Sequence, residues 1–148
     1  MKQPVKSGLP KPGAPIEWAT IADGILYTAQ IPIKANGTIE TGDIGVQTTL
    51  TLENLKRTLK AAGGTLADVA QVLIYLPDPA DFPGMNAVYS EYFDQPYPNR
   101  ATIVAQLMVP GARIEIVAYA HIAKKPKAKA AAPKKPAKKA PAKRRARK

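Results

Sequence analysis

The chain has 148 residues, enough for one domain with a buried core and too few for two domains of ordinary size. Its formal charge of +11 is uneven: residues 1–123 contain nine basic and eleven acidic residues, and residues 124–148 contain thirteen basic and no acidic residues. The absence of cysteine excludes disulfides and thiolate chemistry, and a single histidine argues against a zinc site built from side chains alone.

The first 13 residues contain three prolines and three lysines but little that could be buried. They predict a flexible N-terminal arm over residues 1–13. No apolar segment typical of a secretory signal opens the chain, and no run is long enough to span a membrane. We therefore expect a cytoplasmic protein.

A β-hairpin is predicted next. Residues 25–31 are mostly β-branched, aromatic or apolar, as is typical of a strand. Asn36 and Gly37 follow, and both tolerate positive φ angles, so they suit a tight turn leading into residues 38–40.

Residues 43–62 change to a helical period, in which apolar side chains recur three and four positions apart. These residues are Leu52, Leu55, Leu59 and Ala62. Such spacing predicts an amphipathic helix, and Gly63 and Gly64 predict its end. Residues 70–76 then predict a buried strand.

A second helix is predicted over residues 81–93, before two prolines that would interrupt it. Its apolar side would hold Phe82, Met85, Val88, Tyr89 and Tyr92. Strands over residues 101–107 and 112–122 follow, separated by a turn at 109–111. This order predicts an α+β fold, a single mixed β-sheet with two helices packed on one face.

Residues 124–148 consist only of Lys, Ala, Pro and Arg. Without larger apolar side chains they predict a disordered tail after a folded domain over residues 14–123. Closely spaced cations suit the neutralisation of phosphates regardless of base sequence, so we predict a polyanion-binding tail; a solubilising extension is the alternative. The cations expected to bind are Lys124, Lys125, Lys134, Lys135, Lys138, Lys139, Arg144 and Arg145.

Glu115 is the first candidate for chemistry. In its strand, Ile114 and Ile116 lie on one face, whereas Glu115 shares the other face with Val117 and Tyr119. Both faces are largely apolar, and desolvation raises the pKa of a carboxyl group toward the range useful for proton transfer. The alternative is a glutamate at a sheet edge or in a structural ion pair.

Arg100 is the second candidate. It follows a proline-containing turn that would hold its guanidinium in place, and a planar guanidinium suits bidentate binding of a carboxylate. The alternative is a solvated arginine after a turn. Asn86 and Tyr89 are interpreted as helix residues that pack or hydrogen-bond, and His121 as structural or solvated.

Six short motifs occur in order across residues 15–122: LYTAQIP at 26–32, LENLK at 52–56, AAG at 61–63, MNAVY at 85–89, PNR at 98–100 and IEI at 114–116. Together they resemble the RidA/YjgF family of reactive-intermediate deaminases. The resemblance implies a chorismate-mutase-like homotrimer with active sites in clefts between subunits, and no metal or organic cofactor.

The resemblance also implies an activity, that of a 2-iminobutanoate/2-iminopropanoate deaminase-like hydrolase. Such enzymes convert enamine and imine acids, including 2-aminoacrylate, to 2-oxo acids and ammonia. Arg100 matches the family arginine that holds the substrate carboxylate, and Glu115 matches the glutamate that positions or activates water. The backbone amide near Thr102 would complete the carboxylate clamp.

Three positions depart from the family pattern. Ala29 stands where many members have glycine, and its Cβ would narrow the cleft for the substrate. Thr102 stands where many members have cysteine. Pro15 aligns with the aromatic residue that closes the pocket in active members, and Trp18 is the nearest aromatic candidate for that role.

A different class of function is also open. The domain could be a trimeric scaffold that associates with nucleic acid or the nucleoid, or a ribonuclease or translation-inhibitor-like member of the family without deaminase turnover. The pair Arg100 and Glu115 separates these alternatives, because deamination needs both side chains and tethering needs neither. A lone His121 gives little support to ribonuclease chemistry, which commonly uses paired acid and base groups.

Overall fold

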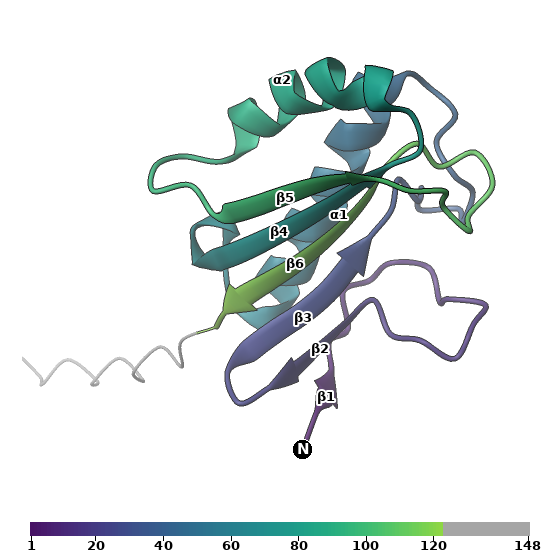
Figure 1. Ribbon diagram of the computed structural model, residues 1–148. Helices are drawn as coiled ribbons and strands as arrows, with labels where there is room; N and C mark the ends of the chain where they lie inside the picture. The colour runs from purple at the N-terminus through teal and green to yellow at the C-terminus, as the bar shows by residue number, and fades with distance from the viewer. Residues whose placement is uncertain (123–148) are drawn as a thin grey trace, which may run out of the picture.

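The computed structural model describes residues 1–122, so the predicted tail and its cations lie outside the described residues. One six-stranded sheet has the order β1-β2-β3-β6-β4-β5, and both helices cover the same face (Figure 1). The elements are β1 (Gln3–Pro4), β2 (Ala19–Ala22), β3 (Ile25–Gln30), α1 (Ile44–Ala62), β4 (Val69–Leu76), α2 (Phe82–Tyr92), β5 (Asn99–Val104) and β6 (Glu115–His121). Only β4 and β5 pair in parallel, so the predicted mixed sheet of an α+β fold is confirmed.

Helix α1 begins and ends where its capping residues require. The Asp43 carboxylate accepts a hydrogen bond from the Val46 amide at 2.9 Å, and Gly63 adopts a left-handed conformation with φ 85°. The predicted apolar stripe faces the sheet, with Leu52, Leu55 and Leu59 fully buried. The helix predicted over residues 43–62 is thereby confirmed.

Helix α2 covers the same face near β5. Met85 and Tyr89 are buried, as predicted for this helix, but Phe82 remains 41% exposed at the margin. Below the helices, alternate residues of β4 and β6 such as Val72 and Ile116 are fully buried. No helix within residues 1–122 has the length and apolar character needed to cross a membrane.

Strand β3 belongs to a different hairpin from the one that the sequence predicted. Strand β3 pairs with β2 through a turn at Asp23 and Gly24, whose φ angles of 51° and 78° are both positive. The predicted turn at Asn36 and Gly37 does form, but it joins residues 38–40 to residues 32–34, through the Ile33–Ile39 bridge and hydrogen bonds of 2.8 Å from the Lys34 amide to the Thr38 carbonyl and from the Glu40 amide to the Pro32 carbonyl. The predicted turn is therefore confirmed, whereas its link to residues 25–31 was wrong, because β2 is short and its sequence lacks the alternation by which strands are recognised.

The predicted flexible arm at residues 1–13 also needs correction. Gln3 pairs with Ile21 in the sheet, and the Val5 amide donates to the Ala19 carbonyl at 2.9 Å. A flexible arm was predicted because the segment has few side chains that could be buried. It is instead held by backbone hydrogen bonds to the edge of β2.

Candidate active site

Arg100 lies on the helix-covered side of the sheet, at its margin. It pairs in register with Val72, which faces the core, and its Nη2 atom donates to Asn86 Oδ1 at 2.9 Å. The guanidinium carbon lies 4.5 Å from the centroid of the Tyr89 ring. A hydrogen bond and an aromatic face thus hold the guanidinium in a fixed orientation, and Asn86 and Tyr89 have the hydrogen-bonding and packing roles predicted for them.

An open hollow of about 250 Å³ adjoins this guanidinium. We call it the arginine hollow; it is lined by Asn86, Tyr89, Ser90, Tyr97, Pro98 and Arg100. The Arg100 guanidinium gives this hollow the positive charge that a substrate carboxylate would need. Among its lining residues there is no acidic group that could activate water.

Thr102 lies two residues further along β5, which is the edge strand of the sheet. The hydroxyl of Thr102 is buried without a hydrogen-bond partner among the described residues. Along its outer side, an edge strand has backbone N–H and C=O groups that form no hydrogen bonds to another strand of the same chain. The strand carrying Arg100 and Thr102 is therefore suited to contact a ligand or a second chain.

Glu115 opens β6 and lies on the opposite, uncovered face. It pairs in register with Tyr75, and the two residues border a hollow of about 360 Å³. We call it the glutamate hollow; it is lined by Tyr75, Ala105, Gln106, Leu107, Met108, Glu115 and Val117. Burial raises the pKa of the Glu115 carboxyl above its ordinary value, which is the direction predicted from its apolar neighbours.

The start of β6 is fixed by contacts that the sequence did not reveal. The Arg113 guanidinium donates to both carboxylate oxygens of buried Asp81, and the Arg113 amide donates to Gln47 Oε1 at 2.8 Å. Gln47 also donates to the Gly111 carbonyl at 3.0 Å. These contacts hold the backbone immediately before Glu115. Asp81 and Gln47 lie 32 and 66 residues before Arg113 in the chain, so no local sequence pattern could have identified these contacts.

Within one chain, the sheet separates the two candidate residues. Arg100 faces α2, whereas Glu115 lies on the uncovered face, and the two hollows share no lining residue. A single copy therefore carries two incomplete sites. One presents an oriented guanidinium, and the other holds a partly desolvated carboxyl group.

Ala29 and Trp18 lie on the β2–β3 side of the sheet. Ala29 pairs with Val117, which also borders the glutamate hollow, so Ala29 and the hollow share the uncovered face. Trp18 immediately precedes β2, and its indole nitrogen donates to the Pro10 carbonyl at 2.6 Å. The structure thus places Ala29 near Glu115 and leaves Trp18 tied to the N-terminal segment, without contact to Arg100.

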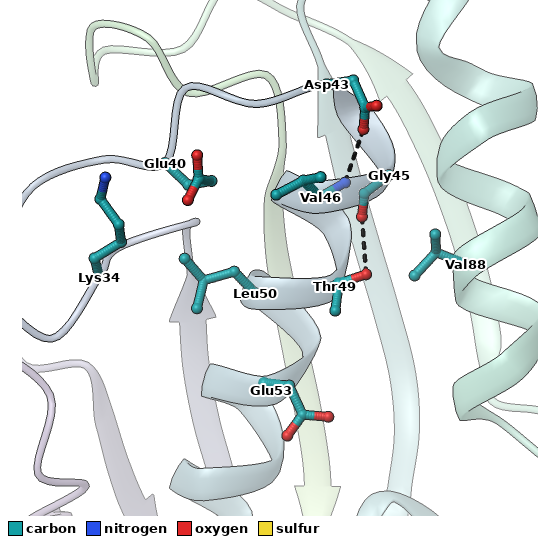
Figure 2. A pocket seen from close by; sticks show the side chains of 9 residues that line it. All are labelled: Lys34, Glu40, Asp43, Gly45, Val46, Thr49, Leu50, Glu53 and Val88. Carbon is teal, nitrogen blue, oxygen red and sulfur yellow. Dashed lines mark hydrogen bonds between the residues drawn. The ribbon is translucent and has the colours of Figure 1, made fainter.

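A larger hollow of about 620 Å³ lies between the outer side of α1 and the segment before it. Figure 2 shows its lining, which includes Val46, Leu50 and the carboxylates of Glu40 and Glu53. Asp43 also borders it, but its carboxylate already caps α1. Neither Arg100 nor Glu115 contributes, and the carboxylates would repel an acidic substrate, so this hollow does not fit the predicted chemistry.

Comparison with known proteins agrees with the fold and the motifs. The family described as endoribonuclease L-PSP matches residues 9–122. The 3-aminoacrylate deaminase RutC of Acinetobacter baylyi is 43% identical over 117 residues, covering 78% of this chain and 93% of that protein. A RutC family protein of Pyrococcus horikoshii is 44% identical over 114 residues, covering 76% and 90% of the two chains.

A solved structure is similar over the same region. YyfA of Yersinia pestis, described as a protein of unknown function of the conserved Rid protein family, superposes with a TM-score of 0.78 at 28% identity, covering 82% of this chain and all of that one. Fold and sequence together define an α+β protein of the Rid type. The chain belongs to the RidA/YjgF family, as its motifs predicted.

Proposed function

We propose that the protein is a deaminase that hydrolyses small 2-imino and enamine acids to 2-oxo acids and ammonia. The observation that carries this proposal is the pair of incomplete sites: a fixed guanidinium at the β5 edge and a partly desolvated carboxyl group on the uncovered face. The similar RutC protein is named as a deaminase of 3-aminoacrylate, a compound that contains both an enamine and a carboxylate.

The proposal includes a homotrimer in which the β5 edge of one copy meets the uncovered face of the next. Exposed apolar side chains support such a contact, because contiguous exposed apolar surface commonly marks an interface. Ile103 and Val104 on β5 are 45% and 58% exposed, and Met108 beside Glu115 is 93% exposed. In this arrangement Arg100 and Thr102 of one copy face Glu115 and Ala29 of its neighbour.

The proposed reaction follows from these two groups. Arg100 holds the substrate carboxylate, and Glu115 takes a proton from water as the oxygen attacks the imine carbon. Glu115 then gives that proton to the imine nitrogen, which yields a carbinolamine. The carbinolamine hydroxyl passes its proton through Glu115 to the nitrogen, the carbon–nitrogen bond breaks, ammonia leaves and the carbonyl of the 2-oxo acid forms. An enamine enters the same sequence after its β-carbon gains a proton. Positioning is the main contribution, because imines of this kind already hydrolyse in water.

The proposed activity can be measured with the wild-type chain. A threonine dehydratase supplies 2-iminobutanoate, and release of 2-oxobutanoate is followed with and without the protein. We expect faster release from the imine than in buffer, and likewise faster release of ammonia and 3-oxopropanoate from 3-aminoacrylate prepared in situ. A rate equal to that in buffer for both substrates would contradict the proposal.

A second candidate function concerns the cationic tail, which carries thirteen of the 22 basic residues. We propose that it binds nucleic acid through phosphates without base specificity, because such charge blocks are commonly interaction segments. Three tails in a trimer would bind more tightly than one. Ribonuclease chemistry is less well supported, because His121 is the single histidine of the chain and such chemistry commonly uses paired acid and base groups.

This binding can be tested with a full-length variant in which the eight tail cations named above are changed to glutamine. We expect wild-type protein to bind a labelled DNA duplex with strong dependence on salt, and the variant to lose most of that binding in fluorescence anisotropy. Equal binding by the two proteins would exclude the tail as the binding segment.

A further inference from the structure

The turn that leads into β6 is held by side chains from the starts of both helices. The Arg113 guanidinium donates through Nε and Nη2 to the two carboxylate oxygens of Asp81, which immediately precedes α2. Gln47, in the first turn of α1, accepts from the Arg113 amide at 2.8 Å and donates to the Gly111 carbonyl at 3.0 Å. Residues 111–113 are therefore fixed to α1 and to α2.

The Asp81 carboxylate is not explained by the helix that it precedes. Aspartate at this position commonly caps a helix by accepting from its first amides, but within residues 1–122 the Asp81 side chain makes no such bond. The residue is only 4% exposed, and a buried carboxylate is unfavourable unless it is paired. Its partner is Arg113, so the contact that this carboxylate makes is with the approach to β6.

The same turn closes the loop that forms one wall of the glutamate hollow. Residues 105–108 of that wall follow an anchored point, at which the Ala105 amide donates to the Leu76 carbonyl at 3.1 Å. They precede a second one, at which the Ala112 amide donates to the Val109 carbonyl at 3.2 Å. Glu115 itself follows Arg113 by two residues, about 7 Å along an extended chain.

We propose that Asp81 is a positioning residue for the deamination reaction and acts on Glu115 through Arg113. The inference rests on the proposed deaminase function and adds to it a residue that touches neither substrate nor water. A carboxylate can activate water only from hydrogen-bond distance, and a displacement of about 1 Å can lower a rate about 100-fold. A bidentate ion pair restrains both the position and the orientation of the guanidinium, and hence of the backbone before Glu115.

The orientation of Arg100 should depend less on this ion pair. The side chains that contact Arg100 lie on α2, and this helix is also tied to α1 by a hydrogen bond of 2.9 Å from the Tyr92 hydroxyl to Glu53. Loss of the Asp81 charge should therefore disturb Glu115 more than the carboxylate-binding guanidinium. The expected signature is a lower kcat with little change in KM.

The test compares two full-length variants with the same change of residue, Asp81→Asn and Asp68→Asn. The Asp68 carboxylate also makes local contacts, because it accepts from the Thr65 amide at 2.7 Å and from the Thr65 hydroxyl at 3.1 Å. Asp68 precedes β4 and lies about 20 Å along that strand from Tyr75, the partner of Glu115. It therefore controls for a lost structural contact away from the glutamate hollow.

Initial rates of 2-oxobutanoate release from 2-iminobutanoate give kcat and KM. Asp81→Asn should lower kcat about 10- to 100-fold and leave KM within about twofold of wild type, whereas Asp68→Asn should keep both values. Arg113→Lys keeps the charge but loses the planar pair of donors, so its kcat should lie between those of wild type and Asp81→Asn.

A double variant shows whether the effect runs through Glu115. Adding Asp81→Asn to Glu115→Gln should lower kcat no further than Glu115→Gln alone, because the carboxylate that Asp81 positions is already absent. If Asp81→Asn does not fold by circular dichroism, the same measurements are made on Asp81→Asn with Arg113→Gln, which places two uncharged amides at the pair.

The possible outcomes separate this inference from the proposed function. Wild-type kcat in Asp81→Asn, or a full further loss when it is added to Glu115→Gln, would overturn the positioning role and leave the deaminase function intact. An equal loss in Asp68→Asn, or a rise in KM in place of a fall in kcat, would also overturn it. If the wild-type chain does not accelerate 2-oxobutanoate release, the proposed function is wrong, and the positioning role with it.

Discussion

Replacing Arg100 with alanine should reduce kcat/KM for 2-iminobutanoate by about 100-fold or more, because the substrate carboxylate would lose a charged, bidentate partner. The guanidinium is already oriented by Asn86 and Tyr89, so little of its binding energy is spent on ordering the side chain. The measurement is the initial rate of 2-oxobutanoate release at substrate concentrations above and below KM.

Two variants make the Arg100 result specific. Arg100→Lys keeps the charge but loses the planar pair of donors, so its kcat/KM should lie between those of wild type and Arg100→Ala. Arg57→Ala removes an exposed arginine from α1 and should leave the rate unchanged. Wild-type kcat/KM in Arg100→Ala would remove Arg100 from the proposed site.

Replacing Glu115 with glutamine should reduce kcat by about 100- to 10,000-fold, the usual contribution of a positioned acid or base. The carboxylate is the active form, so activity should fall as the pH drops through the pKa of Glu115. Burial raises that pKa above 4.5, and the acid limb of the wild-type kcat/KM profile should therefore lie above this value. A wild-type rate in Glu115→Gln would exclude the proposed role.

Stability gives an independent check on Glu115. Because burial raises the pKa of this carboxyl in the folded state, its protonated form is favoured there, and the stability it contributes at low pH is lost as the pH rises through the folded-state pKa. At neutral pH the buried charge is unfavourable, and glutamine removes it. Glu115→Gln should therefore be at least as stable as wild type in urea at pH 7, even though its kcat should be much lower.

Features encoded locally could be predicted from the sequence. Helix α1 has its period and its terminal Gly63 within a single segment, and both act as predicted; its Asp43 cap is equally local. The raised pKa of Glu115 likewise follows from the apolar residues on both sides of it in the strand. In each case the determining interactions lie within a few residues.

Features that depend on pairing between distant segments of the chain could not be predicted from the sequence. The register that places Glu115 opposite Tyr75, and Arg100 opposite Val72, joins segments far apart in the chain. Alternation shows which residues of one strand share a face, but it does not relate the face of one strand to that of another. The separation of Arg100 from Glu115 within one copy became visible only with this register.

Buried polar residues were missed for a related reason. Asn54 on α1 donates to the carbonyls of Ile31 and Ile33, and Gln30 donates to the Thr58 hydroxyl. These side chains are buried because they satisfy polar groups beside β3. Their residue types alone favour the surface, so only the fold reveals their role.

The central claim is that each active site is formed by Arg100 of one copy of the chain and Glu115 of another. It is tested by mixing inactive Arg100→Ala and Glu115→Gln chains, unfolding them together and refolding them as mixed oligomers. In a closed trimer, random mixing of equal amounts should give about a quarter of the wild-type activity, because some sites then combine an intact arginine with an intact glutamate. If the mixture stays as inactive as its components while mixed oligomers form, the two residues do not share a site between copies.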